Sequence, residues 1–194
     1  PILARRLGGE IVSADSRQVY KGLDVGTGKD LAEYGSGRRR APYHLIDVAD
    51  PRRQYNLARY QREAVKAIDG ILAREKLPIV VGGSGLYLQA LVDSFRPGGR
   101  VAPGVRKKWS GLDADGLYEE IAARQPEFAR RINASDRHNR RRLERYLEII
   151  VSGQQAAKRE SPYDWLVIGL RCQEDELRLR IRERLIRRLE KEGL

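Results

Sequence analysis

The 194-residue sequence contains no methionine, only two histidines and a single cysteine, Cys172. One thiol cannot build an intrachain disulfide framework, which excludes the small disulfide-rich domains of secreted proteins. His44 and His138 stand apart and show neither metal-ligand spacing nor a Cys/His pair. We therefore interpret both as structural or surface residues, and we assign no metal ligand in this chain.

Long apolar runs are also absent. No run approaches the roughly 20 apolar residues that a membrane-spanning helix requires. We find no signal peptide and no lipidation motif. These observations predict a cytoplasmic protein without a membrane partner, and nothing in the sequence requires more than a monomer.

Both ends of the sequence fall inside structural patterns. The chain has no Met at position 1, and residues 2–7 are typical of the end of a helix, with Gly8 and Gly9 as its C-cap. The chain stops at Leu194, directly after a glycine. We interpret the sequence as a fragment of a longer protein.

Positive charge is abundant. Lys and Arg number 38 against 27 Asp and Glu, which gives a net charge of +11. Such a surplus on a small domain favours a polyanionic partner, although a merely soluble basic protein is the alternative. Arg supplies most of the surplus, and its guanidinium binds phosphates through paired N–H groups and stacks on bases.

The apolar pattern predicts an α/β fold. Residues 11–14 and 78–81 have the composition of buried strands, and residues 56–75 between them have helical spacing. Gly82–Gly85 form a tight turn that leads into a helix over residues 86–92. This order is typical of a parallel sheet. The inward face of the first helix is predicted to contain Leu57, Tyr60, Ala64, Ile68 and Leu72.

The composition changes after Ser94. Residues 95–104 hold Pro, Gly and Arg and are expected to be irregular. Residues 105–157 show only helical patterns, with helices predicted over 115–124 and 139–151. A strand is predicted over 165–170, followed by a long charged helix over 173–192. The predicted domains are an α/β core over 1–95 and 161–194, interrupted by a helical insertion over 96–160.

Four polar residues directly follow the first predicted strand: Asp15, Ser16, Arg17 and Gln18. The carboxyl ends of parallel strands are where an open α/β sheet places its ligands. Asp15 could act there as a general base or as a carboxylate near a metal. It could equally cap a turn, and the local sequence does not decide between these roles.

Two glycine motifs resemble phosphate loops. Gly82–Gly85 could bring backbone N–H groups close to a ligand, or could simply form a tight turn. It is not a Walker A motif, because no GK[ST] follows. Gly26–Lys29 lacks the upstream glycine and a feeding strand, so we interpret it as a turn.

Arginine is concentrated in two helical patterns. Seven Arg stand against two acidic residues in 130–145, and there Arg141 and Arg145 oppose an apolar stripe of Leu143, Leu147 and Ile150. We favour phosphate contacts over a solvated basic face.

The last helix carries a second apolar stripe, made of Leu177, Ile181, Leu185 and Leu189. Arg184 borders this stripe and Arg188 lies within it. At least one of the two should meet a carboxylate or an anion, because a buried unpaired charge is costly. Snorkelling to the helix edge is the alternative for Arg188.

Four stretches together resemble one family, the tRNA dimethylallyltransferases, also called tRNA isopentenyltransferases. They are Ser13–Lys29, His44–Pro51, Ile79–Leu91 and Arg141–Ile149. The resemblance implies a P-loop-NTPase-like parallel-sheet core with a helical, tRNA-binding insertion. The family's N-terminal strand and its GK[ST] loop, which hold the diphosphate and Mg²⁺, have no counterpart in this chain.

The resemblance also implies a reaction. A dimethylallyl group moves from dimethylallyl diphosphate to N6 of the adenosine on the 3′ side of the tRNA anticodon. Asp15 corresponds to the base and Arg184 to the Arg near the diphosphate, and Ser84 stands where the family usually has Thr. The implied substrate and tRNA contacts are Asp15, Ser16, Arg17, Gln18, Ser84, Arg106, Arg141, Arg142, Leu143, Glu144 and Arg145.

Two alternatives stay open at this point. An adenylate isopentenyltransferase shares the DS-x-Q-V-Y stretch, but a free nucleotide does not require an Arg-rich helix. A non-catalytic RNA-binding module would suit a chain without a phosphate loop. We expect the 194 residues alone to be inactive, with the Mg²⁺ ligands outside them.

Overall fold

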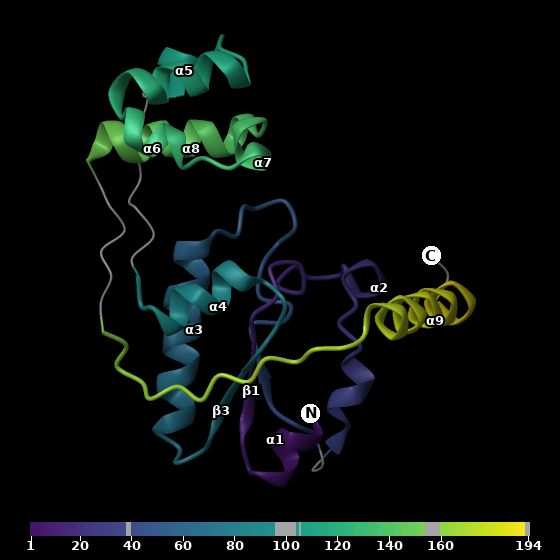
Figure 1. The fold of residues 1–194 in the computed structure, drawn as a ribbon. Helices are drawn as coiled ribbons and strands as arrows, with labels where there is room; N and C mark the ends of the chain where they lie inside the picture. Colours follow the sequence, from purple (N-terminus) through teal and green to yellow (C-terminus); the bar gives the residue numbers. More distant parts are fainter. Residues whose placement is uncertain (38–39, 96–103, 105, 154–159, 193–194) are drawn as a thin grey trace. The chain divides into compact units, whose positions relative to one another are not determined.

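The computed structural model describes residues 1–37, 40–95, 104, 106–153 and 160–192 (Figure 1). The chain divides into two compact units. Unit 1 contains Pro1–Ser94 and Arg159–Leu194, and unit 2 contains Phe95–Lys158. Unit 1 holds a sheet with its helices, whereas the described part of unit 2 is helical.

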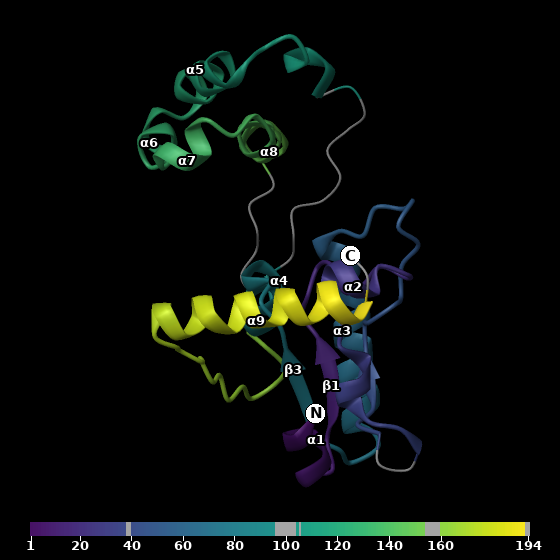
Figure 2. The ribbon, with the colours of Figure 1, turned by 90° about the vertical axis from the view of Figure 1, so that its right-hand side faces the viewer.

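The sheet of unit 1 has three parallel strands in the order β2-β1-β3. They are β1 (Glu10–Ser13), β2 (Tyr43–His44) and β3 (Pro78–Val81). β1 lies between the other two and is buried along its whole length, because both of its edges are paired and helices pack against it (Figure 2). The parallel α/β class predicted from the sequence is confirmed.

Helix α3 (Leu57–Leu72) lies between β2 and β3 in the chain. Its first turn is capped by Asn56, whose side chain accepts a hydrogen bond from the backbone N of Arg59 at 2.9 Å. The helix turns its apolar face to the sheet, with Tyr60, Ala64, Ile68 and Ile71 buried. The predicted inward residue Leu72 is instead 45 % exposed, because the helix ends there and Ile71 takes the core position.

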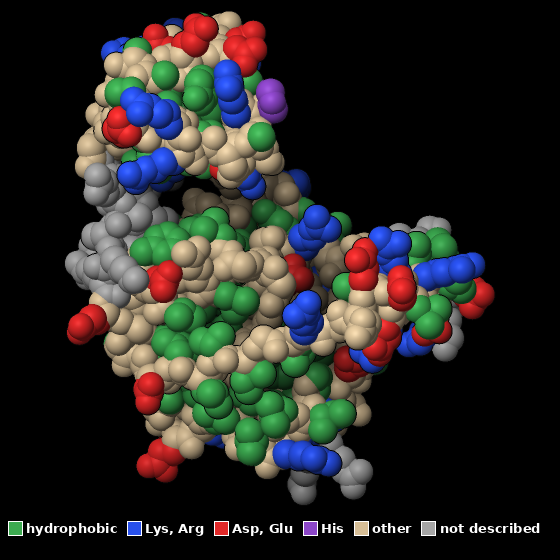
Figure 3. Space-filling view, viewed as in Figure 1, with side chains coloured by type: hydrophobic (Ala, Val, Ile, Leu, Met, Phe, Trp, Pro, Cys, Tyr) green, Lys and Arg blue, Asp and Glu red, His purple; other side chains and the backbone are tan. Residues whose placement is uncertain are grey.

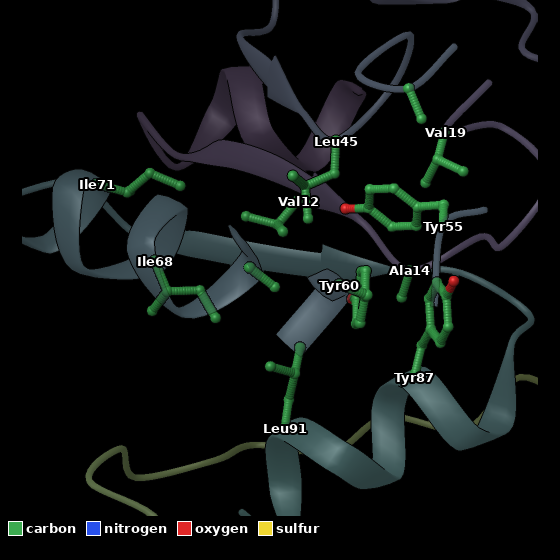
Figure 4. Packing of buried hydrophobic residues seen from close by; sticks show 12 residues of the cluster. Val12, Ala14, Val19, Leu45, Tyr55, Tyr60, Ile68, Ile71, Tyr87 and Leu91 are labelled. Carbon is green, nitrogen blue, oxygen red and sulfur yellow. The ribbon is translucent and has the colours of Figure 1, made fainter. Parts of the chain in front are cut away.

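Helix α4 (Gly85–Val92) follows β3 and packs on α3. Tyr87 of α4 stacks on Tyr60 of α3, with ring centroids 3.8 Å apart (Figure 4). The same core contains the buried side chains Val12, Ala14, Val19, Leu45, Ala49, Tyr55, Ala64, Ile68, Ile71 and Leu91. This core therefore fixes the position of the loops that leave the carboxyl ends of β1 and β3.

Short helical turns surround the sheet. α1 (Ile2–Arg6) precedes β1, and Gly8 follows it with φ 62°, as expected for a glycine C-cap. α2 (Asp24–Thr27) ends at Gly28 in the left-handed conformation. The 3-10 helix η1 (Leu31–Tyr34) follows directly. Gly26–Lys29 is thus a helical turn and its exit, in agreement with its interpretation as a turn.

Two expectations for strands were wrong. β3 forms, but it is not buried, and Val81 is 54 % exposed. Residues 160–173 contain no helix or strand, and Leu166 and Leu170 are 86 % and 97 % exposed. A strand requires a neighbour that pairs with its backbone groups. Among the described residues, β3 has no strand beyond it and 165–170 has none at all, so the apolar composition does not lead to burial.

Helix α9 (Glu174–Glu192) completes the described part of unit 1. Its predicted stripe of Leu177, Ile181, Leu185 and Leu189 is not inside a core, since these side chains are between 46 and 58 % exposed. Apolar side chains accordingly reach the surface of unit 1 (Figure 3). No helix in the described part of the chain is long and apolar enough to cross a bilayer.

Unit 2 is built from helices packed on one another. They are η3 (Arg106–Trp109), α5 (Ala114–Arg124), α6 (Pro126–Arg130), α7 (Ala134–Arg137) and α8 (Arg140–Ser152). Asp113, Asn133 and Asn139 cap α5, α7 and α8 through their side chains. The two helices predicted by periodicity are confirmed as α5 and α8. Their core contains Trp109, Leu117, Ile121, Ala129, Leu143 and Leu147. The predicted irregular segment 95–104 lies almost entirely outside the described residues.

Candidate functional site

Asp15 lies in the loop that leaves the carboxyl end of β1. Its Oδ1 accepts hydrogen bonds from the backbone N of Arg17 at 2.8 Å and of Gln18 at 3.3 Å. Asp15 therefore caps a turn, which was one of its two expected roles. Among the described residues, Oδ2 has no hydrogen-bond partner, so the turn leaves one carboxylate oxygen available.

Ser84 brings the loop after β3 against this turn. Its Oγ accepts a hydrogen bond from the backbone N of Ser16 at 2.9 Å and donates to the Ser16 Oγ at 3.2 Å. The backbone of Ser84 in turn donates to the carbonyl of Ala14 at 3.1 Å. Asp15, Ser16 and Ser84 thus meet at one edge of the sheet, as the parallel order of the strands predicts.

Gly82 is what permits this close approach. A Cβ atom at this position would lie 2.2 Å from the carbonyl oxygen of Ala14. No side chain fits at that separation, and the contact is backbone, which cannot move aside easily. The glycine turn therefore allows the loops after β1 and β3 to pack closely.

Gln18 and Arg184 are linked through one carbonyl group. The Gln18 side chain donates to the Gly28 carbonyl at 3.1 Å, and the Arg184 guanidinium donates to the same oxygen at 3.3 Å. These residues come from the loop after β1 and from α9. The structure therefore connects the Asp15 turn to Arg184 through the backbone at Gly28.

Asp30 pairs with both arginines of α9. Arg184 forms an ion pair with its carboxylate, and Arg188 donates to the two carboxylate oxygens at 3.0 and 3.2 Å. This confirms the expectation that at least one of these arginines meets a carboxylate. Burial opposes ionisation of Asp30, but its hydrogen bonds to Arg188 and Arg184 outweigh that effect and lower its pKa. Two guanidinium groups sharing one carboxylate leave a net positive charge.

Tyr87 is a neighbour of the Asp15 turn that sequence reasoning missed. Its ring is buried below the Asp15 turn, and burial together with the nearby Tyr20 and Asp15 raises the pKa of its hydroxyl to about 12. It therefore stays neutral and able to donate at neutral pH. A sequence signal existed, because Tyr87 follows Ser84, the N-cap of α4, by three residues and so lies in the first turn of the helix next to Ser84.

The predicted RNA-contacting residues of α8 do not share one environment. Arg141 is exposed and has no side-chain partner among the described residues. Arg142 pairs with Asp136, Glu144 with Arg140, and Arg145 donates to the buried Glu148 at 2.9 Å. Leu143 is fully buried in the core of unit 2, so its side chain packs inside the unit and does not face solvent.

The remaining predicted residues are Ser16, Arg17 and Arg106. Arg17 and Ser16 are exposed at the Asp15 turn. Arg106 lies in η3, and its side chain is outside the described part of the structure. The described residues contain no group of three His, Cys, Asp or Glu side chains arranged to hold a metal ion. The described residues therefore do not fit a Mg²⁺ site.

A cavity of about 870 Å³ lies at the other end of the sheet. It is lined by residues that precede the strands, such as Gly9 and Lys76, and by Arg5 and Arg40. None of the predicted site residues lines it. Its cations already have partners, since Arg5 donates to the Glu33 carbonyl at 3.3 Å, Arg40 to the Tyr43 hydroxyl at 2.5 Å, and Lys76 pairs with Glu10 at 3.2 Å.

Comparison with protein families gives an independent result. A model of the family described as IPP transferase matches residues 18–194. The tRNA dimethylallyltransferase 1 of Hahella chejuensis is 43 % identical over 195 residues, covering 99 % of this chain and 61 % of that protein. The tRNA dimethylallyltransferase of Thermomicrobium roseum is 42 % identical, covering 96 % of this chain and 58 % of its own length. This chain thus spans about three fifths of the length of these relatives.

Solved structures agree with this result. A full-length tRNA isopentenylpyrophosphate transferase from Bacillus halodurans superimposes with a TM-score of 0.63 at 36 % identity, covering 99 % of this chain and 61 % of that one. A eukaryotic dimethylallyltransferase, captured in crystallographic snapshots while acting on tRNA, superimposes with a TM-score of 0.77 at 27 % identity. That match covers 97 % of this chain and 48 % of the other.

Proposed function

We propose, because this chain belongs to the IPP transferase family, that it is part of an enzyme that prenylates tRNA. In this proposal a dimethylallyl group passes from dimethylallyl diphosphate to N6 of the adenosine on the 3′ side of the anticodon. The names of the relatives support the reaction class. Since the chain spans about three fifths of those relatives, the activity is proposed for the whole protein, and the 194 residues alone are expected to be inactive.

One observation carries the assignment of the site. The Asp15 carboxylate is held by two backbone N–H groups through Oδ1, while Oδ2 has no partner among the described residues. It lies at the sheet edge where Ser84 and Ser16 converge. A fixed carboxylate with one available oxygen is suited to accept a proton from a substrate.

The proposed step requires such a base. The exocyclic amine of adenosine is a poor nucleophile, because its lone pair is delocalised into the ring. As N6 forms a bond to the allylic carbon, the bond between that carbon and the diphosphate oxygen breaks. The diphosphate leaves with the bonding electrons, and Asp15 Oδ2 takes the proton from N6. The hydrogen bonds between Ser84 and Ser16 hold the loops after β1 and β3 together around Asp15.

Arg184 is proposed to contact the leaving diphosphate. Its side chain is 55 % exposed, compared with 16 % for Arg188, although both pair with Asp30. The net positive charge of this group favours an anion, and Arg can bind two oxygens of a phosphate at once. A diphosphate oxygen at Arg184 would leave Arg188 to neutralise Asp30.

Unit 2 is proposed to bind the tRNA. Lys and Arg side chains lie on its surface (Figure 3), and Arg141 of α8 is exposed without a partner among the described residues. The target adenosine would have to leave its base stack to reach a buried or enclosed position near Asp15. The same proposal includes a cytoplasmic monomer and Mg²⁺ accompanying the diphosphate, with no described residue assigned to the metal.

Two other functions make different predictions. An adenylate isopentenyltransferase would accept AMP instead of tRNA, and the exposed Arg141 would then have no role. A non-catalytic RNA-binding module would bind tRNA but transfer nothing. The matches to curated tRNA dimethylallyltransferases favour the first proposal over both.

A chimera tests the proposal. These residues are joined to the segments of the Hahella chejuensis relative that the alignment leaves uncovered, and labelled dimethylallyl diphosphate is offered with tRNA, with AMP or with neither. We expect label only in tRNA. Label in AMP would support the adenylate enzyme, and no label with retained tRNA binding would support the RNA-binding module.

Within the chimera, Asp15→Asn tests the base. Asn keeps the turn but cannot take a proton, so we expect transfer to fall by about 10²-fold or more, the usual contribution of a general base, with tRNA binding retained. Asp50→Asn is the matched control, because Asp50 also caps a turn by accepting from the backbone N of Arg52 at 2.9 Å. Near-normal transfer by Asp15→Asn would rule out Asp15 as the base.

A further inference from the structure

Lys29 is a buried cation in the loop between α2 and η1. Its side chain is only 1 % exposed. Its Nζ donates to the Tyr20 carbonyl at 2.8 Å and to Asp24 Oδ1 at 2.6 Å, and it also bonds to Asp47 Oδ1. An ammonium group has three donors, so every one of them is used inside the protein.

The surroundings keep this ammonium charged. Burial alone would lower the pKa of Lys29, but its bonds to Asp24 and Asp47 outweigh that effect and raise the pKa. Its three partners belong to different segments: Tyr20 follows the Asp15 turn, Asp24 begins α2, and Asp47 follows β2. Lys29 therefore connects its loop to all three of these segments within unit 1. From the sequence this position was predicted to be part of a simple turn.

The residues on either side of Lys29 have unusual backbone conformations. Gly28 has φ 63°, and Asp30 has φ 44° and ψ 46°, both in the left-handed region. For a residue other than glycine this conformation is unfavourable, so local contacts must hold it. The bonds of Lys29, between the two, provide that restraint.

These two neighbours contact residues proposed to bind substrate. The Gly28 carbonyl accepts from Gln18 and from Arg184, and the Asp30 carboxylate pairs with Arg184. Three consecutive residues thus present a carbonyl to the Asp15 loop, an ammonium to the interior and a carboxylate to α9. Lys29 itself is too deeply buried to touch a substrate.

We propose that Lys29 is a positioning residue: its buried ammonium holds the Gly28 carbonyl and the Asp30 carboxylate where they orient Gln18 and Arg184. Without it, the left-handed turn relaxes and Arg184 loses its fixed partners. The inference rests on the proposed function for the consequence at the diphosphate, but the restraint of the turn stands on the contacts alone.

The first experiment measures the turn itself. Lys29→Met removes the ammonium and keeps a long unbranched side chain, and Lys21→Met is the matched control, since Lys21 is exposed in the same loop. In the 194-residue chain, we expect amide hydrogen exchange to rise at residues 28–30 and around 184 in Lys29→Met, with α3 unchanged. Lys21→Met should match the wild type. Because two unneutralised carboxylates could unfold the chain, Lys29→Met with Asp47→Asn is measured as well and should show the same local increase.

The second experiment measures the consequence in the chimera described above. We expect the KM for dimethylallyl diphosphate to rise about tenfold in Lys29→Met, the factor that corresponds to one misplaced charge-assisted hydrogen bond, with the KM for tRNA within about twofold of wild type. A merely structural role would instead lower the amount of active enzyme without changing either KM.

Three results would overturn the inference. They are unchanged exchange at residues 28–30 in both Lys29 variants, an unchanged KM for dimethylallyl diphosphate, or an equal rise in both KM values. A wild-type chimera that transfers nothing to any acceptor would overturn the proposed function instead. The exchange measurement would then still decide whether Lys29 holds the turn.

Discussion

The backbone N of Ser16 donates a hydrogen bond to the Oγ of Ser84, 2.9 Å away, although 68 positions separate the two residues. This bond joins the loop that leaves β1 to the loop that leaves β3. It depends on the close packing of Gly82 against Ala14, which leaves no space for a Cβ atom. The hydroxyl at position 84 therefore orders the turn that carries the Asp15 carboxylate.

We expect Ser84→Ala to slow transfer by the chimera by more, expressed as a free energy, than it lowers the free energy of unfolding. The variant loses a hydrogen bond that contributes about 1 kcal/mol to folding, but it also frees the backbone N of Ser16 beside the proposed base. Ser84→Thr is the control, because it keeps the hydroxyl and should retain most of the activity. Rates and unfolding midpoints measured on the same samples separate the two effects. Equal losses in Ser84→Ala and Ser84→Thr would show that the hydroxyl is not what matters.

A second prediction concerns acid stability at the other end of the sheet. Glu10 is buried in β1, and its carboxylate lies 2.8 Å from both Arg74 Nη2 and His44 Nε2 and 3.2 Å from Lys76 Nζ. Burial would raise its pKa, but the hydrogen bonds from Arg74, His44 and Lys76 outweigh that effect and lower the pKa from 4.5 to about 2. The contact also gives His44 the structural role expected for it.

The sign of the pH dependence follows from this shift. Because the pKa in the folded state lies below that in the unfolded state, the stabilisation is complete above about pH 4.5 and is lost as the pH falls towards about 2. We expect Glu10→Gln to lower the free energy of unfolding at pH 7 by about 2–3 kcal/mol. The difference in free energy of unfolding between wild type and Glu10→Gln should become smaller as the pH falls from about 4.5 towards about 2.

Denaturant unfolding of the 194-residue chain at a series of pH values measures that gap. Glu33→Gln is the control, since Glu33 is exposed and its side chain should contribute little. A gap that stays constant from pH 7 down to the acid end would mean that the ionised form of Glu10 does not contribute to the fold.

The third prediction separates two arginines of α8. Arg141→Ala should weaken tRNA binding and reduce the slope of log affinity against log salt by about 0.7–0.9, the effect of one phosphate contact. Arg145→Ala should instead lower stability, because Arg145 pairs with Glu148, whose side chain is 3 % exposed. Binding measured between about 50 and 200 mM salt gives the slope.

Arg130→Ala is the matched control for this series. It removes the same charge from α6, where Arg130 pairs at the surface with Glu127 at 3.0 Å. If Arg141→Ala left the slope of log affinity against log salt unchanged, the tRNA contact would have to lie in another part of the chain.

Much of the fold could be predicted because the pattern that specifies each helix lies within the helix's own residues. The helices α3, α5, α8 and α9 follow from periodicity that repeats within each segment. The strand predicted over 165–170 failed for the opposite reason, since strand formation depends on a partner elsewhere. The same limit explains the exposed stripe of α9, whose residues have the right spacing for a core but no described surface to pack against.

The sequence by itself determined the parallel α/β class, the family and the position of Asp15 after a strand. Each of these depends on the alternation of strand and helix patterns along the chain or on short polar motifs, which consist of residues adjacent in sequence. Only the tertiary structure decided that Asp15 keeps one oxygen available, that Gly28 joins Gln18 to Arg184, and that Lys29 is buried. The last two depend on α9 and on the loop after β2 meeting a distant turn. Contacts between segments that far apart leave no trace in local periodicity, since they arise only when packing brings the segments together.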